Sequence, residues 1–140
     1  MKIQNLFYSI IIVVFAFTFA AASMMSKNYY CKWCGSKHAT VQNLTLNNCS
    51  KNPNGNKHEL YEGPEQSEYI CKYCGTKSKT IQNLTLNNCS KSPTKKHEAY
   101  EGTEKSEYTC KYCGSKHKTI QNLTLNNCSK SPTKKHQPAL

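Results

Sequence analysis

The chain has 140 residues and a formal net charge of +11, and every basic side chain except histidine is a lysine. Its nine cysteines cannot all pair within one chain, which excludes a complete framework of internal disulfides. Asp is absent and the eight acidic residues are all Glu, so few residues are present from which the acid–base pair of an enzyme could be built.

The first predicted element is an N-terminal hydrophobic segment, residues 1–23. Lys2 precedes an apolar run of seventeen residues, Leu6 to Ala22, which is followed by a serine. This layout is typical of a secretory signal peptide, and the run is short for a helix that spans a membrane. We expect a cleaved signal or, alternatively, a retained anchor, and hence a secreted or membrane-anchored protein. A true start at Met24 or Met25 would instead predict a cytoplasmic protein.

Three similar units follow, 40 and then 39 residues apart, which is a period typical of modular arrays. Each unit has two cysteines separated by two residues, a third cysteine after fourteen more residues, and a histidine after a further seven or eight. Four such ligands, two of them in a close pair, are what tetrahedral zinc requires, so the sequence predicts three Zn²⁺ sites. The predicted ligand sets are Cys31, Cys34, Cys49 and His58; Cys71, Cys74, Cys89 and His97; and Cys110, Cys113, Cys128 and His136.

Comparison of the three copies separates ligands from other histidines. His38 and His117 align with Ser78 of the middle copy, so they are not obligatory ligands. A unit such as residues 69–97 is shorter than the roughly 40 residues below which a domain usually needs a disulfide or a metal. Metal binding and folding are therefore expected to be one event.

Each unit also carries local structural signals. A tyrosine stands two residues before the first cysteine and a glycine follows the second, which predicts a short hairpin with a tight turn. In the middle copy, Thr80 is a candidate N-cap for a helix of about two turns, with Ile81 and Leu84 on its apolar face, that leads to Cys89. The segment before His97 contains proline and varies in length between copies, so the fourth ligand is expected to come from a loop.

This layout resembles the tandem Cys-Cys-His-His zinc fingers over residues 29–136. The resemblance implies small metal-stapled modules: three tandem zinc fingers, each a short β-hairpin knuckle plus a short helix and a loop. The chain departs from that family because its third ligand is Cys, its central spacing is fourteen rather than about twelve, and its fourth ligand lies off the helix. No base-contact residue is therefore carried over. The expected units are fingers at 29–58, 69–97 and 108–136, joined by acidic linkers at 59–68 and 98–107.

Charge is divided between fingers and linkers. The fingers contain four, six and six lysines and no acidic residue, whereas all eight Glu lie in the linkers. Such lysine-rich units predict binding to nucleic acid or another polyanion, mainly through phosphates because the chain has no Arg for guanine readout. The candidate polyanion contacts are Lys32, Lys72, Lys95, Lys96, Lys111, Lys134 and Lys135. We also expect the linker glutamates to lie across neighbouring lysine-rich faces.

Alternative functions remain open at this stage. The knuckle aromatics Trp33, Tyr73 and Tyr112 are candidates for a protein-interaction scaffold, and an exported structural protein is a third possibility. A zinc site closed by four protein ligands leaves no position for substrate, so we expect no enzyme and no small-molecule substrate. The expected state is a monomer with flexible linkers.

The predicted compartment and the predicted metal sites conflict, because oxidising compartments favour disulfides over metal-binding thiols. Six Asn-x-Ser/Thr sequons fall inside the predicted helices or beside a ligand cysteine, and we interpret them as asparagine-rich composition rather than glycan sites.

Overall fold

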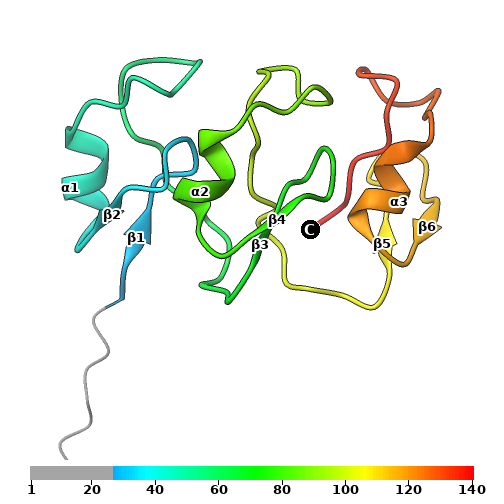
Figure 1. The fold of residues 1–140 in the computed structure, drawn as a ribbon, viewed down its shortest axis with the longest axis horizontal. Coiled ribbons are helices and arrows are strands. Elements are labelled where there is room, and N and C mark those ends of the chain that lie inside the picture. Colours follow the sequence, from blue (N-terminus) through cyan, green and yellow to red (C-terminus); the bar gives the residue numbers. More distant parts are fainter. Residues whose placement is uncertain (1–26) are drawn as a thin grey trace, which may run out of the picture.

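The computed structural model describes residues 27–140, and the predicted signal peptide or anchor lies outside the described residues. Figure 1 shows three repeated units in a row, each made of a short antiparallel hairpin followed by a short helix. We call residues 29–58, 69–97 and 108–136 repeats 1, 2 and 3. Within the described part, no helix has both the length and the hydropathy needed to cross a membrane.

The same three elements occur in the same order in every repeat. The hairpins and helices are β1 (Tyr29–Tyr30), β2 (Lys37–His38) and α1 (Val41–Leu46); β3 (Tyr69–Ile70), β4 (Lys77–Ser78) and α2 (Ile81–Leu86); and β5 (Tyr108–Thr109), β6 (Lys116–His117) and α3 (Ile120–Leu125). The predicted architecture of hairpin, short helix and loop is therefore confirmed.

The hairpin turn forms where the sequence predicts it. In repeat 2, Tyr69 pairs with Ser78 and Ile70 pairs with Lys77. Gly75 closes the turn with a φ of +77°, and its N–H donates a hydrogen bond to the carbonyl of Cys71 at 2.8 Å. A side chain would disfavour this left-handed conformation, which explains the glycine.

The helix has about the length that the sequence predicts, but it ends before the third cysteine. Thr80 is the N-cap, as expected, and its hydroxyl accepts a hydrogen bond from the Asn83 N–H at 3.0 Å. The helix has six residues and ends at Leu86, because Asn87 turns to an extended conformation. Cys89 therefore lies three positions beyond the helix rather than on it.

The core of repeat 2 is completed by the repeat before it. Tyr61, which follows repeat 1 in the linker, is buried against Tyr69, Ile81 and Leu84, and Tyr30 of β1 packs on the same cluster. The rings of Tyr61 and Tyr69 meet edge to face with centroids 5.6 Å apart, a favourable aromatic geometry.

Repeat 3 receives the same contribution from repeat 2. Tyr100 and Ile70 are buried with Tyr108 and Ile120 in its core. The Tyr61 hydroxyl donates to the carbonyl of Tyr100 at 3.1 Å, and the Tyr100 hydroxyl donates to the carbonyl of Ala139 at 2.6 Å. The linkers thus contain buried, hydrogen-bonded side chains in this structure, and they are not the free tethers that the sequence suggests.

The first residue of each helix shows how much surface the packing between repeats buries. Val41 at the start of α1 is 38% exposed, whereas the equivalent Ile81 and Ile120 are 2% and 1% exposed. The difference arises because, among the described residues, no repeat precedes repeat 1.

The contact between repeats predicts different effects for two equivalent glycine substitutions. A Cβ on Gly75 would lie 2.5 Å from the backbone nitrogen of Gln121 in repeat 3, whereas a Cβ on Gly114 would meet nothing within 4 Å. Both residues have nearly the same φ, +77° and +78°, so the backbone cost of alanine is shared. We expect Gly75→Ala to lower the free energy of unfolding by about 1–3 kcal/mol more than Gly114→Ala. Urea denaturation of the metal-loaded variants measures the difference, and equal losses would contradict the packing.

Candidate metal centres

Each repeat gathers four potential metal ligands into one cluster. The ligand atoms of each set lie within 4.8 Å of one another, and three of the four residues in each set are buried. The structure brings together all twelve residues that the sequence singles out: Cys31, Cys34, Cys49 and His58; Cys71, Cys74, Cys89 and His97; and Cys110, Cys113, Cys128 and His136.

The distances between ligand atoms fit one tetrahedral ion. Cys31 Sγ and Cys49 Sγ are 3.9 Å apart, and the second cysteine of every repeat lies 3.4 Å from the Nδ1 of its histidine. Bond lengths of about 2.3 Å to sulfur and about 2.0 Å to nitrogen would separate two sulfurs by about 3.8 Å, and sulfur from nitrogen by about 3.5 Å. The described cysteines form no disulfide. Three bound metal ions are therefore consistent with the geometry.

The hairpin presents the first two ligands of each set. In repeat 1, the Cys31 N–H donates to the Ser36 carbonyl at 2.9 Å, and this bond fixes the chain around the turn. The N–H of Trp33 points at the Cys31 sulfur at 3.4 Å. A backbone donor in this position stabilises a thiolate, which is the form that binds metal.

The third and fourth ligands are held by a second short pairing. In repeat 2, the Cys89 N–H donates to the Lys95 carbonyl at 2.9 Å, and Asn88 forms a β-bridge with Lys96. This pairing places His97 beside Cys89. The longer loop of repeat 1 makes the equivalent bond from Cys49 to Asn56 at 2.7 Å, so the inserted residue is absorbed in the loop, as predicted.

Burial and backbone donors act in opposite directions on the first cysteine of each set. Burial raises the pKa of the Cys31 thiol to about 11 and that of Cys71 to about 12. Burial also raises the pKa of Cys110, but the N–H groups of Tyr112 and Gln137 outweigh it and bring the value to about 7. In repeats 1 and 2 the buried thiols are costly to ionise alone, and a divalent cation would remove that cost.

The second cysteine and the histidine are closer to their metal-binding forms. Burial raises the pKa of Cys74, but its hydrogen bonds with Thr76, Cys71 and Cys89 together outweigh burial, so the net pKa is lowered. Burial lowers the pKa of His58 and of His97. The neutral imidazole that this favours is the form that binds a metal.

The two histidines excluded by comparison of the copies lie beside the clusters and not within them. The Nε2 of His38 is 3.2 Å from the Ser36 hydroxyl, and its ring centroid is 5.3 Å from that of His58. The ring centroid of His117 lies 6.2 Å from that of His136. The four-ligand clusters include neither residue.

Two of the predicted polyanion contacts face carboxylates instead. Lys32 is ion-paired with Glu59 and Lys72 with Glu98, both at 2.5 Å. Each lysine also lies over the aromatic ring that follows it, 5.2 Å from the centroid. Lys111 does not form the equivalent ion pair, because Gln137 occupies the position that is Glu in the other repeats.

The hairpin lysines are also paired with linker glutamates. Lys77 lies 3.3 Å from Glu68 and 3.1 Å from Glu104, and Lys116 lies 3.2 Å from Glu107. These contacts agree with the expectation that the linkers lie across neighbouring lysines. They occur on the hairpin side of the molecule, so the charge of that side is largely balanced.

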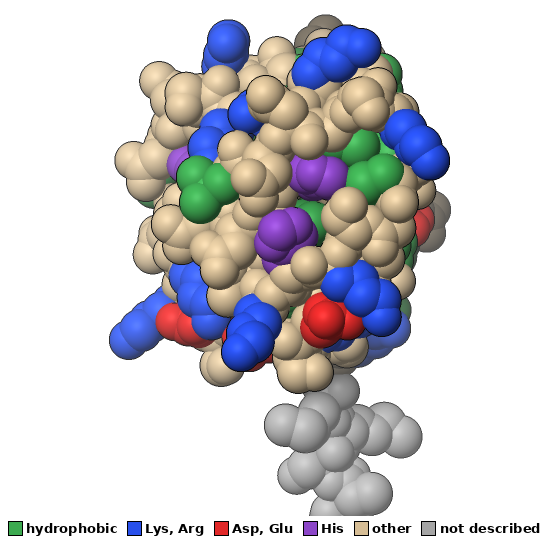
Figure 2. Space-filling model, turned by 90° about the vertical axis from the view of Figure 1, so that its right-hand side faces the viewer, with side chains coloured by type: hydrophobic (Ala, Val, Ile, Leu, Met, Phe, Trp, Pro, Cys, Tyr) green, Lys and Arg blue, Asp and Glu red, His purple; other side chains and the backbone are tan. Residues whose placement is uncertain are grey.

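The opposite edge of the molecule carries lysines that form no ion pair within the described residues. The loops after the third cysteine, residues 50–57, 90–96 and 129–135, line the upper edge in Figure 1, while the linkers turn at the lower edge. Figure 2, seen from the repeat 3 end, shows lysines at the upper rim and mixed lysine and glutamate at the lower rim. The loops contain no acidic residue, and we call their eight lysines the lysine edge: Lys51, Lys57, Lys91, Lys95, Lys96, Lys130, Lys134 and Lys135.

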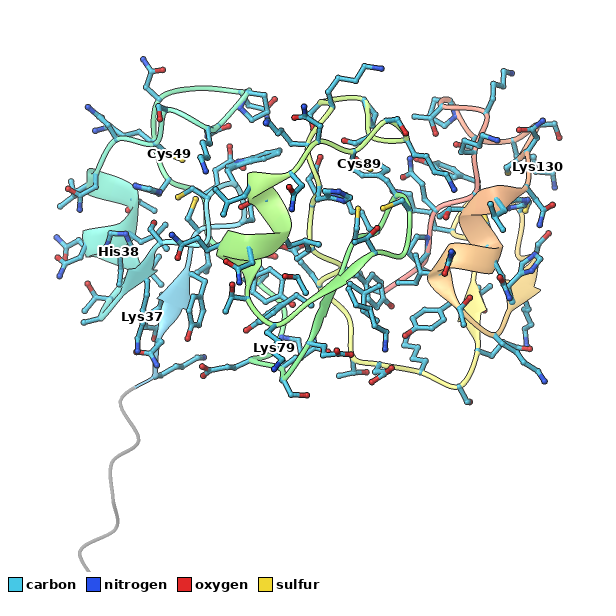
Figure 3. The ribbon with its side chains drawn as sticks, in the orientation of Figure 1. Lys37, His38, Cys49, Lys79, Cys89 and Lys130 are labelled. Atoms are coloured by element: carbon cyan, nitrogen blue, oxygen red, sulfur yellow. The ribbon has the colours of Figure 1, made fainter. Side chains whose placement is uncertain are left out.

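The lysine edge includes four of the lysines predicted as polyanion contacts and four that the prediction did not include. Figure 3 places Lys130 in the upper half of the molecule, level with Cys49 and Cys89, whereas Lys37 and Lys79 lie lower down. Within residues 27–140, none of the edge lysines forms an ion pair. A signal was present in the sequence, because a Ser-Lys pair follows the third cysteine in every repeat.

The knuckle aromatics are packed rather than presented. Trp33 is only 5% exposed and belongs to the core of repeat 1, and Tyr73 and Tyr112 are half-buried. A lysine covers each ring. The rings therefore offer little free surface to a partner.

Comparison with protein-family models, curated proteins and solved structures found no match to this chain. The likeness to zinc fingers therefore rests on the molecule itself, which repeats a cluster of three cysteines and one histidine three times in small hairpin–helix units.

Proposed function

We propose that this protein is a zinc-stabilised array of three repeats that binds polyanions, nucleic acid among them, along the lysine edge. The observation that carries the proposal is the separation of charge. Linker glutamates form ion pairs with lysines of the hairpin side, whereas none of the eight loop lysines forms an ion pair within residues 27–140. Glu59 and Glu98 touch the loops at Asn52 and Thr94, but their carboxylates are already paired with Lys32 and Lys72.

Zinc is the metal that best suits the clusters. Three thiolates and one imidazole in a closed tetrahedral arrangement are typical of structural zinc sites. The four protein ligands fill the coordination sphere, so the ion is assigned a structural role. Holding the third cysteine and the histidine also fixes both ends of the loop that carries the edge lysines, for example between Cys89 and His97.

Phosphate contact fits the edge better than base readout does. The lysines are point charges on flexible stems, and the chain has no Arg that could form a bidentate contact with guanine. Lys57, Lys96 and Lys135 donate to groups of their own repeat, which leaves Lys51, Lys91, Lys95, Lys130 and Lys134 available. A protein-interaction scaffold built on Trp33, Tyr73 and Tyr112 has less support, because those rings are covered.

The proposal predicts that edge lysines matter more than an equal number of paired lysines. We expect the triple variant Lys51→Gln, Lys91→Gln and Lys130→Gln to bind a single-stranded oligonucleotide about tenfold more weakly. The slope of log K against log salt should also become shallower by about 2, since each lost phosphate contact removes about 0.7. Fluorescence anisotropy over a salt series gives both quantities.

The matched control replaces Lys32, Lys77 and Lys116 by Gln, which removes the same charge from lysines that are ion-paired with Glu. This variant should keep most of its affinity. Equal weakening in both triple variants, with three metal ions retained in each, would show that only net charge matters and would overturn the assignment of the edge.

A further inference from the structure

Three leucines at the helix ends have no role in the cores of the repeats. Leu46, Leu86 and Leu125 are the last residues of α1, α2 and α3, and they are 65%, 55% and 58% exposed. The segment Gln-Asn-Leu-Thr-Leu-Asn-Asn-Cys-Ser around them is identical in all three repeats. Its first leucine is buried in each core, whereas the second points to solvent. We call the three exposed residues the leucine row.

The leucine row lies beside the lysine edge. The ammonium group of Lys57 donates to the carbonyl of Leu46 at 2.7 Å, and that of Lys135 lies 3.5 Å from the carbonyl of Leu125. The three helices follow one another along the row of repeats, one in each repeat, and the chain leaves each of them towards the loops at the upper edge (Figure 1). One side of the array therefore combines three apolar side chains with a band of unpaired lysines.

This combination of groups matches a lipid surface better than a nucleic acid. A phosphate backbone is contacted by lysines and makes no use of an exposed leucine. An anionic bilayer offers phosphate and carboxylate headgroups to lysines and an apolar layer below them to leucine side chains. Single exposed leucines are ordinary, but here the same leucine recurs in every repeat next to the same lysine loop.

We infer that the leucine row and the lysine edge together form a docking surface for an anionic lipid bilayer. The inference rests on the proposed function and names the class of polyanionic surface. The lysines contact headgroups, and the leucines enter the boundary between headgroups and acyl chains. The three loops lie along one edge, so a flat surface can meet all of them at once, and three weak contacts then add as a multivalent one.

A tryptophan reporter in the leucine row tests the inference in the full chain. Trp33 is the only tryptophan, and the other repeats have tyrosine at its position, so Trp33→Tyr provides a background without signal. Leu86→Trp then places the reporter in the row. With metal-loaded protein and vesicles of phosphatidylcholine and phosphatidylserine, we expect a blue-shifted emission that brominated lipids reduce by about half. Vesicles of phosphatidylcholine alone should give no change, and Leu125→Trp should behave in the same way.

Val41→Trp in the same background is the matched control, since Val41 is exposed at the first residue of the six-residue helix α1, at the opposite end from Leu46 of the leucine row. Its emission should not be quenched, whereas replacing Lys51, Lys91 and Lys130 by Gln should abolish quenching at position 86. Unquenched reporters at 86 and 125, in protein that still binds the oligonucleotide, would overturn the lipid surface and leave the polyanion proposal standing. Loss of oligonucleotide binding as well would overturn both.

Discussion

Replacing His136 by Gln is expected to remove one of the three metal ions and to unfold repeat 3, whereas replacing His117 by Gln should leave all three ions bound. His136 holds its Nδ1 3.4 Å from the sulfur of Cys113, while the four-ligand cluster does not include His117. Structural zinc contributes roughly 10–16 kcal/mol to folding in finger peptides, which is more than a unit of this size can recover from its own core.

Metal content per chain and hydrogen exchange resolved by repeat measure this effect. In His136→Gln, amides of repeat 3 should exchange as in an unfolded chain while those of repeat 1 stay protected. Each variant replaces one histidine of repeat 3 by glutamine, so His117→Gln controls for the general effect of the substitution. Three retained ions in His136→Gln would contradict the assigned ligand set.

Replacing Tyr61 by Ala is expected to damage repeat 2 rather than repeat 1, although the residue follows repeat 1 directly in the chain. The side chain is 5% exposed and packs in the core of repeat 2. Removing a buried ring of this size costs about 3–5 kcal/mol. Because folding and metal binding are coupled, the metal affinity of the second site should fall roughly 100- to 4,000-fold. Titration with a competing chelator, followed by repeat-resolved exchange, measures the loss.

The contacts between repeats 1 and 2 place side chains of repeat 1 and its linker in the core of repeat 2. Tyr30 and Tyr61 pack there, whereas the core of repeat 1 is built from its own residues and Leu60. The direct loss of core contacts in Tyr61→Ala should therefore fall on repeat 2. Tyr29→Ala is the matched control, because Tyr29 packs only on the core of repeat 1. A loss in repeat 1 equal to that in repeat 2 for Tyr61→Ala would contradict this assignment.

The features that the sequence predicts well are local ones. The spacing of the cysteines, the N-cap at Thr80 and the left-handed turn at Gly75 each depend on a few neighbouring residues and on the geometry of one metal ion. Comparison of the three copies also separates His58 from His38 correctly, because an ion holds its ligands to fixed positions and leaves other histidines free to vary.

The features that the sequence analysis misses depend on contacts between repeats. Tyr61 and Tyr100 recur in the linkers, but nothing in their local sequence shows that they enter the core of the following repeat. Which lysines form ion pairs with glutamate also depends on how the linkers pack against the repeats. In the sequence, Lys72 and Lys96 are equally good candidates for contact with a polyanion. In the structure, Lys72 forms an ion pair with Glu98, whereas Lys96 donates a hydrogen bond to Asn88.

The buried tyrosines at the joints have a consequence for any partner of the array. A chain of loosely connected fingers could adjust its spacing to whatever it binds. Here the hydroxyl groups of Tyr61 and Tyr100 donate to the carbonyls of Tyr100 and Ala139, and the two rings are buried in the core of the following repeat. The packing of the repeats therefore fixes the distance between successive lysine-rich loops, and a partner that contacts more than one loop must match that distance.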